Sequence, residues 1–160
     1  MQDELALRLA ELGIDTARLA ARGLQPYAEA AAEQLVLADV NDAGREFHLL
    51  PGAATAWQAM RDAAAADGVT LFLVSAFRRV ARQHEIVAAK LARGQSLDAI
   101  LAVSAAPGFS EHHTGRAIDI GTPGSPVLEQ HFETTPAFAW LQQRAANYGF
   151  AMSFGPDNAS

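Results

Sequence analysis

A ten-residue stretch that ends at Asp119, Ser-Glu-His-His-Thr-Gly-Arg-Ala-Ile-Asp, holds the clearest candidates for chemistry in this chain. His112 and Asp119 carry side chains that bind a borderline metal such as zinc. Gly115 adopts backbone angles that other residues resist, so the chain can turn between these two ligands. In an extended segment the carboxylate of Asp119 faces away from Ile118 and Ile120. We therefore expect the apolar pair to anchor a short strand while the carboxylate points into a cleft.

The composition of the chain excludes several classes of protein. Its 160 residues favour a single domain, and the absence of cysteine excludes disulfides, cysteine-ligated zinc and thiol catalysis. The net charge of −6 argues against a nucleic-acid surface, and no apolar run approaches the ~20 residues that span a bilayer. The chain starts with an acidic segment rather than a secretory signal. We expect a cytoplasmic protein, or a periplasmic or cell-envelope protein if a leader has been removed.

Hydrophobic spacing and turn residues predict helices and strands that alternate irregularly. Asp15, Ser96 and Thr135 have side chains that cap helix N-termini, and Pro136 suits a first helical position. The run 69–75 is almost entirely apolar and predicts a buried central strand. Because there is no strict β-α-β alternation, we expect an α+β fold. The predicted helices span 5–12, 16–22, 52–67, 78–92, 97–102 and 136–148, and the predicted strands span 34–40, 46–50, 69–75, 118–120 and 150–154.

The pattern Ser110-x-His112-x-x-Gly115-x-Ala117-x-Asp119 fixes five residue types over ten positions. It resembles the zinc signature of the VanY-type D-alanyl-D-alanine carboxypeptidases. These enzymes belong to a broader group with the LAS, or hedgehog-like, zinc peptidase fold. The resemblance implies a small antiparallel sheet flanked by helices.

Two further segments resemble the same family and occur in the family's order. The segment 75–83, Ser-Ala-Phe-Arg-Arg-Val-Ala-Arg-Gln, resembles Ser-x-Tyr/Phe-Arg-Ser-x-x-x-Gln, with Arg79 where the family usually has Ser. The segment 140–150 matches the helix that precedes the family's last strands. The resemblance covers about 34–160 and leaves 1–33 as an N-terminal helical extension of a single peptidase domain.

The resemblance also implies roles for individual residues. His112 and Asp119 would be zinc ligands. Arg78 would bind the terminal carboxylate of the substrate, or the oxyanion that develops during attack, because a guanidinium is a planar fork of donors that stays charged. Four residues would bind the substrate in the same pocket: Ser75, Phe77, Gln83 and Ser110.

The implied reaction is metal-assisted hydrolysis of a peptide bond. The leading hypothesis is a zinc D,D-carboxypeptidase that removes the terminal D-alanine from peptidoglycan stem peptides. An L,D-carboxypeptidase or an endopeptidase of the same fold remains open, because no residue reports the stereochemistry of the substrate. A non-catalytic module that binds wall peptides is the alternative from a different class.

One part of the family pattern is missing from the sequence. The family has its general base and third zinc ligand in a late Glu-x-x-His segment, and no such segment occurs among the 160 residues. We expect a fragment or a trimmed form of a longer enzyme, with a weak or absent zinc site and little hydrolysis. Adding a Glu-x-x-His segment should restore both.

Other residues are weaker candidates for the missing positions. His113 is adjacent to His112 and would point away from the metal if the backbone is extended. His131 would reach the site only if the loop after Asp119 folds back. We expect His48 and His84 to be surface or core histidines. Three acidic residues are weak candidates for the base: Glu111, Glu129 and Glu133.

Overall fold

The computed structural model describes residues 2–124 and 134–151, and it has the α+β architecture that the sequence predicts. The described α-helices are α1 (Gln2–Glu11), α2 (Thr16–Ala21), α3 (Pro51–Ala66), α4 (Val80–Ala92), α5 (Leu97–Val103) and α6 (Pro136–Arg144). Short 3-10 helices are η1 (Ala32–Gln34), η2 (Glu111–Thr114) and η4 (Ala145–Tyr148). The strands are β1 (Val36–Val40), β2 (Glu46–Leu49), β3 (Phe72–Ser75) and β4 (Asp119–Gly121).

The strands form two antiparallel pairs. β1 and β2 make a hairpin, and β3 pairs with β4. The second pair sets Ser75 opposite Asp119, after a register shift that follows Leu73. Within the described part of the chain β3 has β4 as its only partner, so the described residues do not show the predicted central position of this strand. The strand also begins at Phe72 rather than at position 69.

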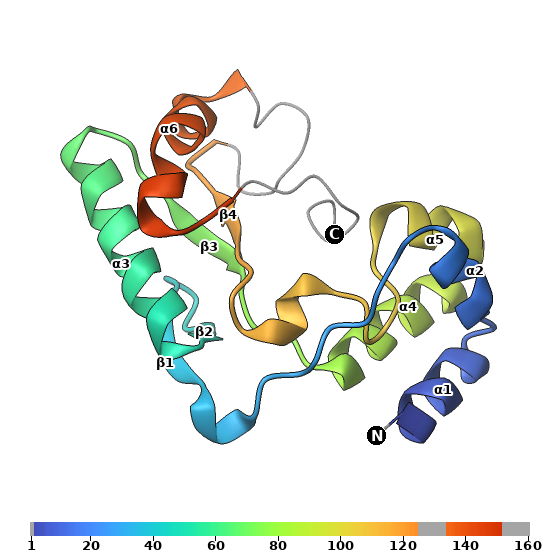
Figure 1. Cartoon of the computed structure of the whole chain (residues 1–160). Coiled ribbons are helices and arrows are strands. Elements are labelled where there is room, and N and C mark those ends of the chain that lie inside the picture. The colour runs from blue at the N-terminus through green and yellow to red at the C-terminus, as the bar shows by residue number, and fades with distance from the viewer. Residues whose placement is uncertain (1, 125–133, 152–160) are drawn as a thin grey trace.

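The main hydrophobic core lies around α3. Trp57 and Met60 of α3 are fully buried, and they belong to one cluster with Leu73 of β3 and Leu141 of α6. Figure 1 shows α3 and α6 on the same side of the molecule as β3 and β4. This core therefore supports the strand pair that carries Ser75 and Asp119.

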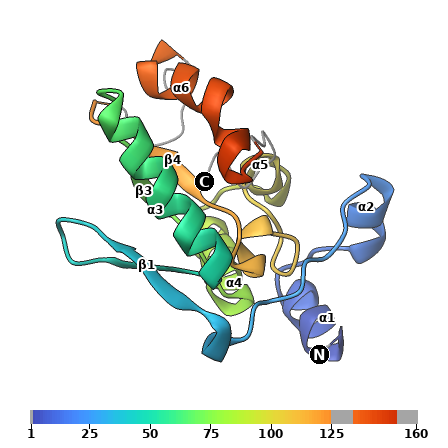
Figure 2. The same ribbon diagram turned by 60° about the vertical axis from the view of Figure 1, so that its left-hand side comes forward.

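A second cluster joins the N-terminal helices to α4 and α5. Leu9 of α1 and Leu19 of α2 are each 1% exposed and belong to the same cluster as Val87 and Ile100. Figure 2 shows α1 and α2 at the side of the molecule away from α3 and α6. Residues before position 34 are thus packed against the helix that follows the 75–79 segment.

The capping predictions are confirmed. The side chain of Asp15 accepts a hydrogen bond from Ala17 N (2.9 Å), and the hydroxyl of Ser96 accepts one from Ala99 N (3.1 Å). Thr135 does the same for α6, in which Pro136 is the first residue. These caps satisfy N–H groups that a helix leaves without internal partners.

Several boundaries of helices and strands differ from the predictions. The predicted helix 78–92 begins at Val80, because Arg79 has extended backbone (φ −72°, ψ 153°). The predicted helix 136–148 ends its α-helical part at Arg144 and continues as η4. Positions 150 and 151 are not in a strand, and the rest of the predicted strand 150–154 lies outside the described residues. Among the described helices, none is both long and apolar enough to cross a membrane.

Candidate metal and substrate site

A tight turn, residues 110–115, precedes the strand that carries Asp119. It contains His112 and is called the ligand turn below. Ser110 caps η2, and its hydroxyl accepts a hydrogen bond from His112 N (3.2 Å). Gly115 ends η2 in the left-handed conformation (φ 75°), which confirms the predicted turn. A Cβ at this glycine would lie 3.0 Å from the side chain of Leu50. The turn is therefore both conformationally specific and closely packed.

His112 and Asp119 are brought together in the interior. Nε2 of His112 lies 3.3 Å from Oδ2 of Asp119, and the two residues are only 1% and 2% exposed. Nδ1 of His112 donates to the carbonyl of Ala76 (2.7 Å). Burial alone would lower the pKa of His112, but the hydrogen bond and negative charge of Asp119 outweigh it and raise the pKa above its usual value.

The chemistry of this pair fits a zinc ion. Metal-binding histidines usually donate their second ring N–H to a carbonyl or carboxylate, as His112 donates to Ala76. Oδ1 of Asp119 is buried and has no hydrogen-bond partner, which is costly for a carboxylate oxygen unless a cation binds it. In residues 2–124 and 134–151, no group of three or more His, Asp or Glu side chains is placed to hold a metal. The described residues thus supply two candidate ligands, His112 and Asp119.

The guanidinium of Arg78 is held by two buried polar side chains. Its two terminal nitrogens donate to Oε1 of Gln83 (2.9 Å) and to Oγ of Ser75 (2.8 Å). Nε2 of Gln83 in turn donates to the carbonyl of Ala105 (2.7 Å). Gln83 is fully buried and Ser75 is 4% exposed. The amide oxygen of Gln83 therefore orients Arg78, while its amide nitrogen is held by the main chain at Ala105.

Main-chain contacts join the segment 75–83, called the Arg78 segment below, to the ligand turn. Arg78 N donates to the carbonyl of His112 (3.1 Å), and Nδ1 of His113 donates to the carbonyl of Arg78 (2.8 Å). Nε2 of His113 accepts from Gly108 N (3.0 Å). A neutral imidazole that carries its proton on Nδ1 satisfies both contacts. His113 is therefore a fully buried connector, a role that its position beside His112 in the sequence did not reveal.

The Arg78 segment also lines a pocket of about 430 Å³. Ser75, Phe77 and Arg78 belong to its lining, and Gln83 does not. Ser110 is fully buried and does not line this pocket; its hydroxyl caps η2 instead. Phe77 N donates to the carbonyl of His48 (3.0 Å), so the pocket wall is attached to β2.

The segment before β1 crosses the ligand turn and is bonded to it. Tyr27 N donates to the carbonyl of Gly108 (2.8 Å), and Ala30 N donates to the carbonyl of His113 (2.8 Å). The carboxylate of Glu29 accepts from Val80 N (2.7 Å), at the first residue of α4. These contacts join residues far apart in sequence, and no local pattern predicts them.

The weaker ligand candidates either form no group of three possible ligands among the described residues or lie outside those residues. His48 is partly exposed and lies 3.8 Å from Glu46, and His84 lies near Glu11. Glu111 is in the first turn of η2. Positions 129, 131 and 133, which hold the remaining candidates, are outside the described part of the chain.

Comparisons with known proteins show that this chain is similar to carboxypeptidases. A D-alanyl-D-alanine carboxypeptidase of Enterococcus faecalis is 32% identical over 108 residues, which is 62% of this chain and 38% of that relative. The solved LdcB LD-carboxypeptidase superposes with a TM-score of 0.67 and 32% identity, covering 80% of this chain and 60% of that one. A vancomycin-resistance D,D-pentapeptidase, VanY, solved with Zn(II), gives a TM-score of 0.58 and 26% identity, covering 82% and 79%.

This chain covers a smaller share of the Enterococcus relative than of the two solved structures. The chain spans 38% of the length of the Enterococcus relative, and a larger part of the two solved peptidases. These solved structures have the mixed architecture of helices and small antiparallel sheets predicted from the sequence. The family model of VanY, D-alanyl-D-alanine carboxypeptidase, matches residues 46–160, which include the Arg78 segment and the ligand turn. This chain therefore belongs to the VanY family of D-alanyl-D-alanine carboxypeptidases.

Proposed function

We propose that this chain carries the substrate-binding part and two zinc ligands of a carboxypeptidase that removes C-terminal D-alanine from peptidoglycan stem peptides. One observation supports the proposal most strongly. A buried His112–Asp119 pair with an unpartnered carboxylate oxygen is joined, through the main chain, to an oriented Arg78. The similar Enterococcus protein is a D-alanyl-D-alanine carboxypeptidase, which supports the reaction. The similar VanY structure contains Zn(II), which supports the metal.

Each residue of the site has a defined task in this proposal. Arg78 binds the terminal carboxylate of the peptide, because its fork of donors matches a carboxylate and remains charged at all working pH values. Ser75 and Gln83 hold that fork in place from inside the protein. His112 and Asp119 would hold zinc, which would polarise the scissile carbonyl of the peptide and lower the pKa of a bound water. The sequence contains no Glu-x-x-His segment from which the family takes its base and third ligand.

A second specificity is favoured by one comparison. The LdcB LD-carboxypeptidase superposes with a TM-score of 0.67, against 0.58 for the D,D-pentapeptidase. An L,D-carboxypeptidase would use the same Arg78 and metal pair, and would differ in the pocket that receives the residue before the scissile bond. The two activities are distinguished by the stereochemistry of that residue alone.

The test is release of D-alanine from two peptides that differ only in the configuration of the penultimate residue. We expect release by a chain extended with a Glu-x-x-His segment in the presence of zinc, and little by the 160-residue chain. Arg78→Lys in the extended chain should raise KM, because lysine keeps the charge but loses the fork. An extended, folded chain that binds zinc and releases no D-alanine from either peptide contradicts the enzyme proposal and leaves a peptide-binding module.

A further inference from the structure

The pocket beside Arg78 is lined by four arginines. Arg45, Arg79 and Arg82 join Arg78 around a volume of about 430 Å³, and none of the described residues in its lining is acidic. The whole chain has only 12 lysines and arginines and a net charge of −6. One third of its basic side chains therefore surround one pocket of an acidic protein. Such a concentration of guanidinium groups favours anionic ligands with more than one negative charge.

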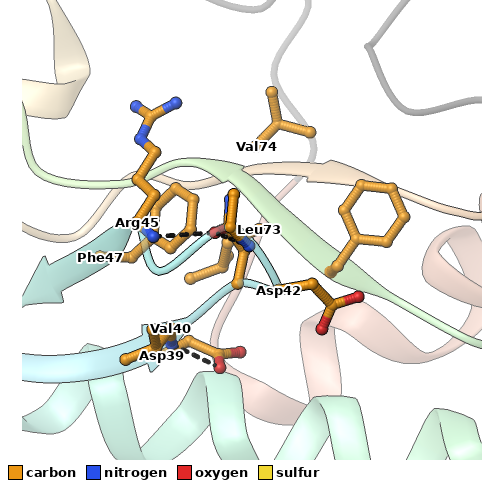
Figure 3. Close-up of a pocket in the computed structure, with 10 residues that line it drawn as sticks. Asp39, Val40, Asp42, Arg45, Phe47, Leu73 and Val74 are labelled. Atoms are coloured by element: carbon orange, nitrogen blue, oxygen red, sulfur yellow. Dashed lines mark hydrogen bonds between the residues drawn. The ribbon is translucent and has the colours of Figure 1, made fainter.

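The three additional arginines come from different elements. Arg45 precedes β2 and lies over the ring of Phe47, with the guanidinium carbon 4.9 Å from the ring centroid. Figure 3 shows Arg45 beside Phe47, between the hairpin and β3. Arg79 immediately precedes α4, and Arg82 is in the first turn of that helix. The charges converge because the hairpin and the start of α4 both face the end of β3.

Among the described residues, Glu85 and Glu29 lie near these arginines; Glu85 forms a weak, exposed ion pair and Glu29 binds a main-chain N–H. Arg82 pairs with Glu85 at 3.1 Å, but both side chains are more than 60% exposed, so a ligand can exchange with this pair at little cost. The carboxylate of Glu29 accepts from Val80 N on the neighbouring side of α4. No hydrogen bond or ion pair joins the Arg79 side chain to another of the described residues. Arg79 is exposed, and it lines both this pocket and a neighbouring pocket that includes Glu29.

We propose that this pocket selects a peptide with a second carboxylate, one or two residues before its C-terminus, in addition to the terminal carboxylate that Arg78 binds. This inference rests on the proposed function and adds a substrate class to it. The second carboxylate would contact Arg79 and Arg82, with Arg45 closing the opposite side. A lysine or other cationic side chain at the same peptide position would be disfavoured by the same charges.

An adjoining pocket gives room for the rest of such a peptide. It has a volume of about 530 Å³, shares Arg45 and Val74 with the arginine-lined pocket, and continues along β3 past Leu73. Figure 3 shows Asp42 in this second pocket, across from Arg45. The charge along β3 therefore changes from basic near Arg78 to mixed near Asp42. A peptide with its acidic end at the arginines matches this gradient.

The experiment measures binding in EDTA, where neither zinc nor hydrolysis contributes. Two D-alanyl-D-alanine peptides of equal length would carry Glu or Gln two residues before the C-terminus, and their Kd values for the 160-residue chain would be compared by calorimetry. We expect the Glu peptide to bind about threefold to tenfold more tightly. Arg79→Ser should reduce this ratio roughly twofold or more, and added salt should reduce it further.

A matched control has the same change in net charge at a distant position. Arg22, at the C-terminal cap of α2, is exposed and outside this pocket, so Arg22→Gln should leave the ratio unchanged. Equal binding of the two peptides overturns the inference and leaves the proposed function standing. Absence of binding by both peptides overturns both. If inorganic pyrophosphate displaces the Glu peptide at a concentration below that peptide's own Kd, the pocket is a general polyanion site and the peptide assignment fails.

Discussion

Arg78 and His112 are joined by a main-chain hydrogen bond of 3.1 Å, in which the N–H of Arg78 donates to the carbonyl of His112. Their side chains leave this junction for different tasks. The guanidinium is held by Ser75 and Gln83, and the imidazole faces Asp119. One main-chain contact thus fixes the candidate carboxylate-binding group relative to the candidate metal ligands. The predictions below follow from the groups that hold this junction in place.

Gln83→Leu is expected to weaken both the fold and the binding of substrate. The change leaves the carbonyl of Ala105 and one end of Arg78 without their partners in a buried region, at a cost of about 1–3 kcal/mol in unfolding free energy. Urea unfolding and peptide Kd measurements check the two effects. Gln142→Leu, on the exposed face of α6, is the control and should change stability by less than about 0.5 kcal/mol. Equal effects of the two substitutions would contradict the role of Gln83.

His113→Ala is expected to destabilise the protein without removing a zinc ligand. The imidazole is fully buried and bonded on both nitrogens, to Gly108 and to Arg78. Its loss leaves two buried main-chain groups unsatisfied and creates a cavity, so we expect a loss of about 2–4 kcal/mol. His48→Ala, at a partly exposed position, should have a much smaller effect. If folded His113→Ala protein loses zinc binding as completely as His112→Ala, His113 must be reassigned as a ligand.

Gly108→Ala tests the packing of α1 against the loop before the ligand turn. Gly108 has φ of 88°, and a Cβ there would lie 2.6 Å from Cδ1 of Leu5. The backbone conformation alone costs about 1–2 kcal/mol for an alanine, and the clash adds to it. The Leu5→Ala background removes the clash and keeps the backbone strain. We therefore expect the substitution to cost less in that background than in the wild type, as measured by thermal unfolding. An identical cost in both backgrounds would show that Leu5 does not pack on Gly108.

The metal-free protein should show a pH dependence that comes from His112. Asp119 raises the pKa of His112 against the effect of burial. Such a histidine contributes stability that is fully present below its unfolded pKa of about 6.5 and is lost as pH rises through the folded pKa. In EDTA, the stability of wild type relative to Asp119→Asn should fall as pH rises above about 6.5. Urea unfolding of both proteins at a series of pH values gives this difference, and a difference that does not change with pH would rule out the coupling.

The sequence predicts the local features of this fold well, because they depend on neighbouring residues. Asp15, Ser96 and Thr135 cap helices. The three-residue spacing that places Trp57 and Met60 on one buried face is a property of α3 alone. The turn at Gly115 is likewise a local requirement. The pairing of His112 with Asp119 follows from the same short segment.

The remaining features depend on contacts between distant segments. The apolar run at 69–75 indicates burial but not the number of neighbouring strands, and the described β3 has β4 as its one partner. The ring of His113 points to Gly108 and Arg78 because those groups approach it in space. The Glu29 contact with Val80 joins the segment before β1 to α4. None of these partners is specified by a spacing along the chain.

Zinc titration followed by long-range ¹H–¹⁵N NMR of the histidine rings tests the central claim most directly. At the lowest zinc concentrations that have any effect, we predict that the Nε2 signal of His112 shifts while its Nδ1 keeps the proton donated to Ala76. Asp119→Asn should remove this shift at the same zinc concentration. If zinc first shifts His48 or His84, or shifts His112 equally in the Asp119→Asn protein, then His112 and Asp119 are not a pair of zinc ligands.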